Sequence, residues 1–233
     1  MANDYNAQNG LEAILSQNGA IISKSHLVLT SGKHSDGYIN LRKLAGETES
    51  MVNISGYISE AVTAQIEATD YTENETIVIV GPETMGRCFA QEVAFNLNCE
   101  LESLDVRYVW CEPNADKTAM RWNSKLEFPD IVSGQHCIIV DDVLTTAKTL
   151  KQTVDLIKST GGIVDGVVVI VRRDLNIIAE TVDVPWLIAL YEVNLQSYES
   201  NNCPLCQRKV PMMLHPGHGH EWIKDHPGYP TTE

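Results

Sequence analysis

The chain has 233 residues, of which 31 are acidic and 17 are basic, and its formal net charge at pH 7 is −14. A surface this acidic repels nucleic-acid phosphates and anionic lipid headgroups, so we expect neither a nucleic-acid partner nor a membrane partner. Hydrophobic residues make up 43% of the sequence, which is enough to bury a core and excludes general disorder.

Nothing in the sequence resembles a membrane span or a secretory signal. Apolar runs such as residues 166–171 are too short to cross a bilayer, and residues 1–5 include no apolar stretch. We therefore expect a cytoplasmic protein with reduced cysteines. Four of these cysteines lie in or beside apolar stretches and are expected to be buried thiols: Cys88, Cys99, Cys111 and Cys137.

Hydrophobic periodicity predicts two helices, followed by alternating strands and helices. Leu11, Ile14 and Leu15 share one face of a short helix that ends at Gly19, and a second helix is expected at residues 50–68. Further along the chain, apolar runs predict strands at 77–80, 104–110, 137–140, 167–171 and 187–190, with helices through 89–97 and 150–157. Continuous apolar runs are typical of parallel strands covered by helices on both faces, so an α/β fold around a central parallel sheet is predicted.

Two segments do not follow this alternation. Residues 112–135 form a long polar connection that contains three of the few cations of the chain, Lys117, Arg121 and Lys125. A connection of this length in a compact domain is more often functional or mobile than passive, although a solvated loop face explains the three cations equally well. Residues 201–233 are rich in Pro, Gly and His and are expected to pack irregularly.

The end of the predicted strand at 77–80 leads into a glycine-bounded turn, Gly81-Pro82-Glu83-Thr84-Met85-Gly86-Arg87-Cys88. The turn has the glycine spacing of a nucleotide-binding P-loop, but Arg87 and Cys88 replace the required lysine and hydroxyl residue. A thiol is also a poor ligand for Mg²⁺, which prefers oxygen. The P-loop interpretation therefore fails, and two interpretations remain: an ordinary turn, or backbone N–H groups exposed to an anion.

The end of the strand at 137–140 carries a stronger chemical signal. Asp141 and Asp142 are adjacent carboxylates, and Thr145, Thr146 and Thr149 follow at the start of the next helix. Hydroxyls and free N–H groups at a helix start favour a phosphate, while paired carboxylates favour a sugar diol or a cation. Together they suit a ribose 5-phosphate, although two solvated aspartates with threonine helix caps remain an alternative.

The string Val140-Asp141-Asp142-Val143-Leu144-Thr145-Thr146 resembles the diphosphoribosyl-binding signature of type I phosphoribosyltransferases. The segment Leu29-Thr30-Ser31-Gly32-Lys33-His34-Ser35-Asp36 resembles the hood of the orotate-specific members, and Cys203-Pro204-Leu205-Cys206 is similar to the ending of one branch. The resemblance implies a phosphoribosyltransferase domain over 1–200, with a hood at about 20–45 and an extension at 201–233. It further implies transfer of phosphoribosyl from phosphoribosyl diphosphate to orotate with Mg²⁺, by a homodimer.

The same resemblance assigns roles to matching residues. Asp141 and Asp142 would hold the ribose hydroxyls, and the loop of Thr145, Thr146, Ala147, Lys148 and Thr149 would bind the 5-phosphate, with alanine where the family usually has glycine. The backbone of Glu83, Thr84, Met85 and Gly86 would meet the pyrophosphate, with Mg²⁺ bridging it to the sugar and no protein ligand assigned to the metal. Orotate would be surrounded by Ser31, Lys33, Tyr38 and Arg173. The cations Lys117, Arg121 and Lys125 are candidates for contacts with the pyrophosphate.

Three questions stay open at this stage. The accepting base could be a purine instead of orotate, and a non-catalytic regulator of the same fold that binds phosphoribosyl diphosphate is a further alternative. Cys203 and Cys206, with His215, His218 and His220, have the components of a zinc site without a standard spacing. His34 is expected to be a hydrogen-bonding loop residue and not a catalyst.

Overall fold

The computed structural model describes residues 2–29, 31–72, 75–101 and 103–232 and contains two compact units. The sheet unit comprises Met1–Glu12 and Leu44–Val193, and the small unit comprises Ala13–Lys43 and Asn194–Glu233. The sequence placed a boundary at residue 200, whereas the structure groups the N-terminal hood with the C-terminal segment. No helix in the described parts of the chain is long and apolar enough to cross a membrane.

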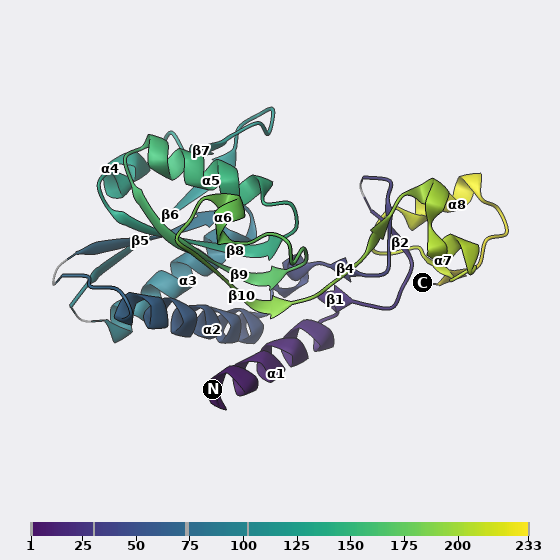
Figure 1. Cartoon of the computed structure of the whole chain (residues 1–233), viewed down its shortest axis with the longest axis horizontal. Helices are drawn as coiled ribbons and strands as arrows, with labels where there is room; N and C mark the ends of the chain where they lie inside the picture. Colours follow the sequence, from purple (N-terminus) through teal and green to yellow (C-terminus); the bar gives the residue numbers. More distant parts are fainter. Residues whose placement is uncertain (1, 30, 73–74, 102, 233) are drawn as a thin grey trace. The chain divides into compact units, whose positions relative to one another are not determined.

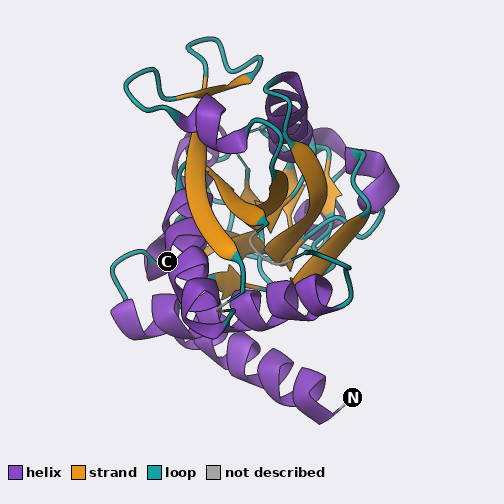
Figure 2. Cartoon of the chain, turned by 90° about the vertical axis from the view of Figure 1, so that its left-hand side faces the viewer, coloured by secondary structure: helices purple, strands orange, loops and turns teal. Residues whose placement is uncertain are grey.

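A six-stranded sheet forms the centre of the sheet unit, with strand order β10-β9-β8-β5-β6-β7 (Figures 1 and 2). The pairs from β10 through β6 are parallel, and β7 joins the edge antiparallel. The predicted α/β fold and its five strands are confirmed, with one short antiparallel strand added. The strands are β5 (Thr76–Pro82), β6 (Asp105–Pro113), β7 (Met120–Trp122), β8 (His136–Leu144), β9 (Ile163–Arg172) and β10 (Trp186–Glu192).

Helices cover both faces of this sheet (Figure 1). On one face lie α2 (Thr48–Glu67) and α3 (Met85–Glu100), and on the other lie α4 (Phe128–Val132), α5 (Lys148–Ser159) and α6 (Ala179–Val182). The helices expected at 50–68, 89–97 and 150–157 are thus present, and so is the first helix, α1 (Ala2–Gln17).

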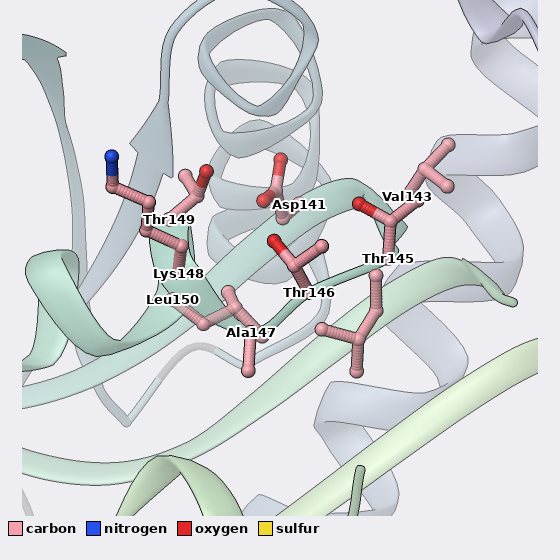
Figure 3. A pocket seen from close by; sticks show the side chains of 9 residues that line it. Asp141, Val143, Thr145, Thr146, Ala147, Lys148, Thr149 and Leu150 are labelled. Carbon is pink, nitrogen blue, oxygen red and sulfur yellow. The ribbon is translucent and has the colours of Figure 1, made fainter. Parts of the chain in front are cut away.

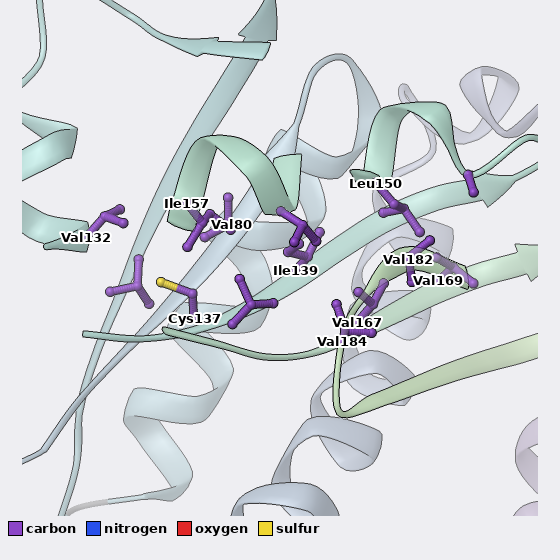
Figure 4. Close-up of a cluster of buried hydrophobic side chains, with 14 of the residues drawn as sticks. Val80, Val132, Cys137, Ile139, Leu150, Ile157, Val167, Val169, Val182 and Val184 are labelled. Atoms are coloured by element: carbon purple, nitrogen blue, oxygen red, sulfur yellow. The ribbon is translucent and has the colours of Figure 1, made fainter. Parts of the chain in front are cut away.

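The core between the sheet and α5 consists of branched aliphatic side chains (Figure 4). Val80 and Ile139 from the strands pack with Leu150 and Ile157 from α5, and each of these side chains is at most 1% exposed. Burying each one stabilises the fold by roughly 1.5–3 kcal/mol. This core fixes the start of α5 against the ends of the strands.

The polar connection at 112–135 is more ordered than its composition suggested. β6 extends to Pro113 and turns back into β7, and α4 follows. The segment is anchored by Met120, Phe128 and Val132, which are buried against the sheet unit. These apolar side chains, together with the pairing of β7 with β6, give the polar stretch a fixed path.

The small unit consists of short elements, as expected for a segment rich in Pro, Gly and His. Its largest sheet has the order β11-β3-β2 and joins residues from both ends of the chain, which is why hood and tail form one unit. Thr30, part of the hood-like segment 29–36, lies outside the described residues. The elements are β1 (Ile21–Ile22), β2 (Leu27–Val28), β3 (His34–Ser35), β4 (Tyr38–Ile39), the 3₁₀ turns Leu41–Leu44 and Ser200–Asn202, β11 (Ser197–Tyr198), α7 (Pro204–Gln207), β12 (Met212–Met213), α8 (Gly219–Asp225) and β13 (Thr231–Thr232).

The expectation that four cysteines are buried was half wrong. Cys111 and Cys137 are buried in strands of the sheet, whereas Cys88 and Cys99 are exposed. Both exposed residues lie on α3, whose core face is formed instead by Phe89, Val93 and Leu97.

Candidate active site

The carboxyl ends of β5 and β8 form the point where the strand order of the sheet reverses. From β5 the chain moves outward to β6, whereas β8 lies on the opposite side of β5 and leads to β9 and β10. In open α/β sheets the loops diverge at such a switch point and leave a crevice that binds ligands. The two chemically marked strand ends of the sequence both lie here.

The end of β8 holds the two carboxylates. The Asp141 side chain is 8% exposed and Asp142 is more accessible. Asp141 Oδ1 accepts a hydrogen bond from the Asp142 N–H at 2.8 Å, and Asp142 Oδ1 accepts one from the Val143 N–H at 2.8 Å. Burial, and then the neighbouring charge of Asp142, raises the pKa of Asp141 well above its ordinary value. Within the residues that the structure describes, this carboxyl has few donors, so a ligand that supplies hydroxyl groups is well matched to it.

The loop after the carboxylates lines an open pocket. Figure 3 shows the Asp141 carboxylate and the hydroxyls of Thr145, Thr146 and Thr149 on the same side of this loop. The three threonines and Lys148 are exposed to solvent, and the start of α5 has no side-chain cap. The first N–H groups of the helix are therefore available, and with the hydroxyls they form a site for an anion such as phosphate.

Ala147 shapes this loop in the conformation that glycine usually adopts. Its φ is 57°, in the left-handed region, and its methyl group is buried in the core below the loop. A non-glycine residue in this region costs roughly 1–2 kcal/mol. The chain therefore keeps the backbone path of a glycine loop while an alanine occupies the position.

The loop after β5 is held by close backbone contacts. A Cβ on Gly81 would lie 2.2 Å from the Gly86 carbonyl oxygen, and a Cβ on Gly86 would lie 2.7 Å from the Val140 carbonyl oxygen. These two glycines let the start of α3 approach β8 directly before Asp141. α3 has no side-chain cap, so its first N–H groups are available to an anion as those of α5 are.

One part of the expected pyrophosphate contact is not available. The Glu83 N–H, one of the backbone donors expected to bind pyrophosphate, instead donates to the Cys111 carbonyl oxygen at 2.8 Å. The peptide bond between Glu83 and Thr84 is cis. The Arg87 guanidinium lies 4.0 Å from the Trp110 ring centroid and 3.5 Å from Glu83 Oε1, which holds this cation beside the loop.

The candidates for contacts with the base lie in different units. Arg173 follows β9 in the sheet unit, and its N–H donates to the Leu144 carbonyl oxygen at 3.0 Å, beside the end of β8. Ser31, Lys33 and Tyr38 belong to the small unit, where Lys33 forms an ion pair with Glu199 at 2.7 Å. Their approach to the crevice stays a prediction.

The three loop cations are all exposed. Lys117 lies in the turn between β6 and β7 with a φ of 58°, and Lys125 lies between β7 and α4. Arg121 lies on β7 and forms an ion pair with Glu112 on β6 at 2.5 Å. Part of the charge of Arg121 is therefore compensated locally, and the role of these cations in binding stays a prediction.

The structure corrects the expected partners of the two tail cysteines. His215 packs edge-to-face against His220, and His218 contacts Glu221 at 3.1 Å. Cys203 and Cys206 instead lie with His26 and His34, with the ligand atoms of all four within 4.8 Å of one another. His26 could not be recognised as a partner from the sequence, because it precedes Cys203 by 177 residues and no local spacing connects them. His34, expected to form hydrogen bonds in the hood, lies in this cluster, and its Nδ1 is 2.9 Å from His26 Nε2.

Comparison with known proteins agrees with this geometry. The sequence profile described as the phosphoribosyl transferase domain matches residues 54–176, which include both strand ends of the crevice. The chain belongs to the phosphoribosyltransferase family. The resemblance seen in the sequence is thus confirmed.

Individual phosphoribosyltransferases support the same assignment. The chain is 29% identical over 193 residues to an orotate phosphoribosyltransferase of Caldanaerobacter subterraneus subsp. tengcongensis, covering 83% of this chain and 89% of that protein. The orotate phosphoribosyltransferase of Aeropyrum pernix shares the fold with a TM-score of 0.55 at 21% identity, over 78% and 93% of the two chains. That of Mycobacterium tuberculosis, solved with 5-phospho-α-D-ribosyl 1-diphosphate, matches with a TM-score of 0.51 at 17% identity, over 80% and 95%.

Proposed function

We propose that this phosphoribosyltransferase transfers phosphoribosyl from phosphoribosyl diphosphate to orotate and releases orotidine 5′-monophosphate and pyrophosphate, a step of pyrimidine biosynthesis. The observation that carries the proposal is the carboxyl pair at the end of β8, followed directly by an uncapped, threonine-rich helix start. The curated relative named above acts on orotate by its name, and the hood-like sequence of residues 29–36 favours the same base.

The sugar phosphate of the donor is matched by the residues after β8. The hydroxyls of Thr145, Thr146 and Thr149 and the first N–H groups of α5 would donate to the 5-phosphate. Asp141 and Asp142 would accept hydrogen bonds from the ribose hydroxyls. When the bond from the anomeric carbon to pyrophosphate breaks, positive charge develops on the sugar, and fixed carboxylates stabilise charge of this sign.

The pyrophosphate would lie at the start of α3, where the N–H groups of Met85 and Gly86 are at the helix N-terminus. The family implies Mg²⁺, and the donor chemistry of the site fits a cation carried by the substrate. Among the described residues, acidic side chains form no cluster of three that could hold an ion alone, so oxygens of the diphosphate and ribose would complete its shell. When bound, Mg²⁺ would neutralise charge on the departing pyrophosphate.

The base would be recognised by cations and polar groups. Orotate carries a carboxylate, which Arg173 can bind with its planar guanidinium, while Ser31, Lys33 and Tyr38 from the hood would surround the ring. N1 of orotate loses its proton as its electron pair forms the new bond to the anomeric carbon. Pyrophosphate leaves with the electrons of the bond that breaks and can accept this proton. We further propose that the protein is a homodimer, as is common in the family, which light scattering with size-exclusion chromatography would test.

The experiment is an absorbance assay of orotate consumption with phosphoribosyl diphosphate and Mg²⁺, run beside assays with adenine, guanine, hypoxanthine, xanthine and uracil. We expect turnover with orotate alone. Asp142→Asn should lower turnover by about 10²-fold or more, whereas Asp155→Asn, the same change on the exposed side of α5, should leave it unaltered. Turnover with a purine would replace the base assignment, and saturable binding of phosphoribosyl diphosphate without turnover would favour a regulator.

A further inference from the structure

Four side chains of the small unit form a cluster that takes no part in the reaction proposed above. His26, His34, Cys203 and Cys206 each direct one ligand-type atom toward the others, and these four atoms lie within 4.8 Å of one another. His26, His34 and Cys203 are at most 1% exposed, and Cys206 is partly buried. Two thiols and two imidazoles that converge in a buried place are the donor set of a closed transition-metal site.

The spacing of the ligand atoms fits a tetrahedron around a common centre. His26 Nε2 lies 2.9 Å from His34 Nδ1, and Cys206 Sγ lies 3.2 Å from His34 Nδ1. Cys203 Sγ and Cys206 Sγ lie 3.7 Å and 3.6 Å from His26 Nε2. Tetrahedral Zn²⁺ with its usual bond lengths separates two nitrogens by about 3.3 Å and a nitrogen from a sulfur by about 3.6 Å. These four distances therefore lie within about 0.4 Å of those in a tetrahedral zinc site, and the remaining two distances are at most 4.8 Å.

The residues around the cluster orient one of its ligands. His26 Nδ1 lies 2.9 Å from the Val210 carbonyl oxygen, which can only accept a hydrogen bond. The proton of the neutral ring is therefore on Nδ1, and Nε2 presents its lone pair to the cluster. The Tyr229 hydroxyl donates to the same carbonyl oxygen at 3.0 Å and packs edge-on against the His26 ring. A backbone carbonyl that fixes the tautomer is the usual outer partner of a metal-binding histidine.

We propose that the small unit binds one Zn²⁺ ion through His26 Nε2, His34 Nδ1, Cys203 Sγ and Cys206 Sγ. Thiolate and imidazole ligands in a tetrahedral set select Zn²⁺ over Mg²⁺ or Ca²⁺, which prefer oxygen. The protein supplies all four ligands, so no position is open to substrate or water. The ion is therefore structural and is distinct from the Mg²⁺ of the transfer reaction.

The position of the ligands in the chain explains what the ion does. His26 directly precedes β2 and His34 begins β3, whereas Cys203 and Cys206 lie at the N-terminus and within α7. The ion thus joins the hairpin of the hood to the C-terminal segment. The small unit has only short strands and a small apolar core, and units of this kind commonly depend on a metal for stability.

The first test is elemental analysis of protein purified without a histidine tag under reducing conditions. We expect one zinc ion per chain in the wild type and none in C203S/C206S or H26A/H34A. Two matched controls should keep one ion per chain: H215A/H218A/H220A, which removes the tail histidines, and C88S/C99S, which removes the two exposed thiols. Loss of zinc from the tail-histidine variant, or zinc retained in C203S/C206S, would overturn the assignment.

A second measurement on the wild type avoids variants that do not fold. Titration of native thiols with an organomercurial, followed by a chromogenic zinc indicator, should first modify the exposed Cys88 and Cys99 without release of zinc, and should release one ion per chain as two further cysteines react. The protein reconstituted with Co²⁺ should show the visible absorption of a tetrahedral thiolate complex. Absence of zinc after reconstitution under reducing conditions, or a disulfide between Cys203 and Cys206 detected by mass spectrometry in freshly reduced protein, would refute the proposal.

Discussion

Replacement of Asp141 with asparagine is expected to make the protein more stable and, at the same time, inactive. Asp141 is 8% exposed, and within the described part of the chain its carboxylate accepts a backbone hydrogen bond from the Asp142 N–H at 2.8 Å. Asparagine keeps an oxygen in the same position, so this hydrogen bond remains. What the substitution removes is a buried negative charge beside a second carboxylate.

The sign of the effect follows from the direction of the pKa change. Burial and the charge of Asp142 raise the pKa of Asp141 in the folded protein above its value in the unfolded chain. The stability contributed by this carboxyl is thus complete below the unfolded pKa and is lost as the pH rises through the folded pKa. Each unit of increase costs about 1.4 kcal/mol at neutral pH, so Asp141→Asn should raise the free energy of unfolding at pH 7 on the order of 1 kcal/mol.

The assay is urea denaturation without substrate at several values of pH between 4 and 8. Three of the four tryptophans, Trp110, Trp122 and Trp186, lie in the sheet unit, and a Trp222→Phe background confines the fluorescence change to that unit. The difference between Asp141→Asn and the wild type should grow as the pH rises, while turnover falls by about 10²-fold or more. A variant that is less stable at pH 7, or a difference that does not change with pH, would refute the reasoning.

Three further predictions concern packing and backbone. Gly86→Ala should destabilise the protein by about 1–3 kcal/mol, because its Cβ would lie 2.7 Å from the Val140 carbonyl oxygen. The control, Gly56→Ala on α2, meets no atom within 4 Å and should stabilise the protein by about 0.5–1 kcal/mol; equal effects of the two changes would contradict the close approach. In thermal denaturation, Ala147→Gly should change the free energy of unfolding by less than about 1 kcal/mol. Ala147→Val should cost more than about 2 kcal/mol, because a branched side chain is strained at a φ of 57°; the reverse order would exclude the left-handed conformation. Tyr71→Phe should cost about 1 kcal/mol in chemical denaturation, since the hydroxyl donates to Asp165 Oδ2 at 2.8 Å, and no loss would mean that water replaces this bond.

The sheet could be predicted because its strands are short, continuous apolar runs, a pattern that few other structural elements share. Residues 77–80, 137–140 and 167–171 all lie in central strands, where both faces are buried and the pattern is strongest. The carboxyl pair and the threonine loop could be placed at one edge for the same reason, since they directly follow a strand. Features that depend on residues close together in the sequence can be predicted from local patterns.

The features that the sequence did not reveal depend on contacts between distant residues. α4 is held by single side chains, such as Phe128, that reach the core from a polar stretch, and β7 by antiparallel pairing with β6. The grouping of the hood with the tail depends on pairing of β3 with β11, and His26 meets Cys203 across 177 residues. Such contacts leave no periodicity or spacing in the sequence. From the sequence, Cys203 and Cys206 are therefore expected to pair with the histidines of the tail and not with His26.

The candidate sites of both units share one physical property, which is that polar groups converge without enough partners inside the protein. The start of α5 has N–H groups with no side-chain cap, Asp141 is a buried carboxyl beside a like charge, and four ligand atoms meet in the small unit. Each arrangement is costly for the free protein and becomes favourable when a ligand of the right chemistry is present. This also explains how a chain of net charge −14 can bind a phosphorylated sugar. Hydroxyls and helix N–H groups supply the local attraction, so the site depends on a few oriented donors and not on the overall charge.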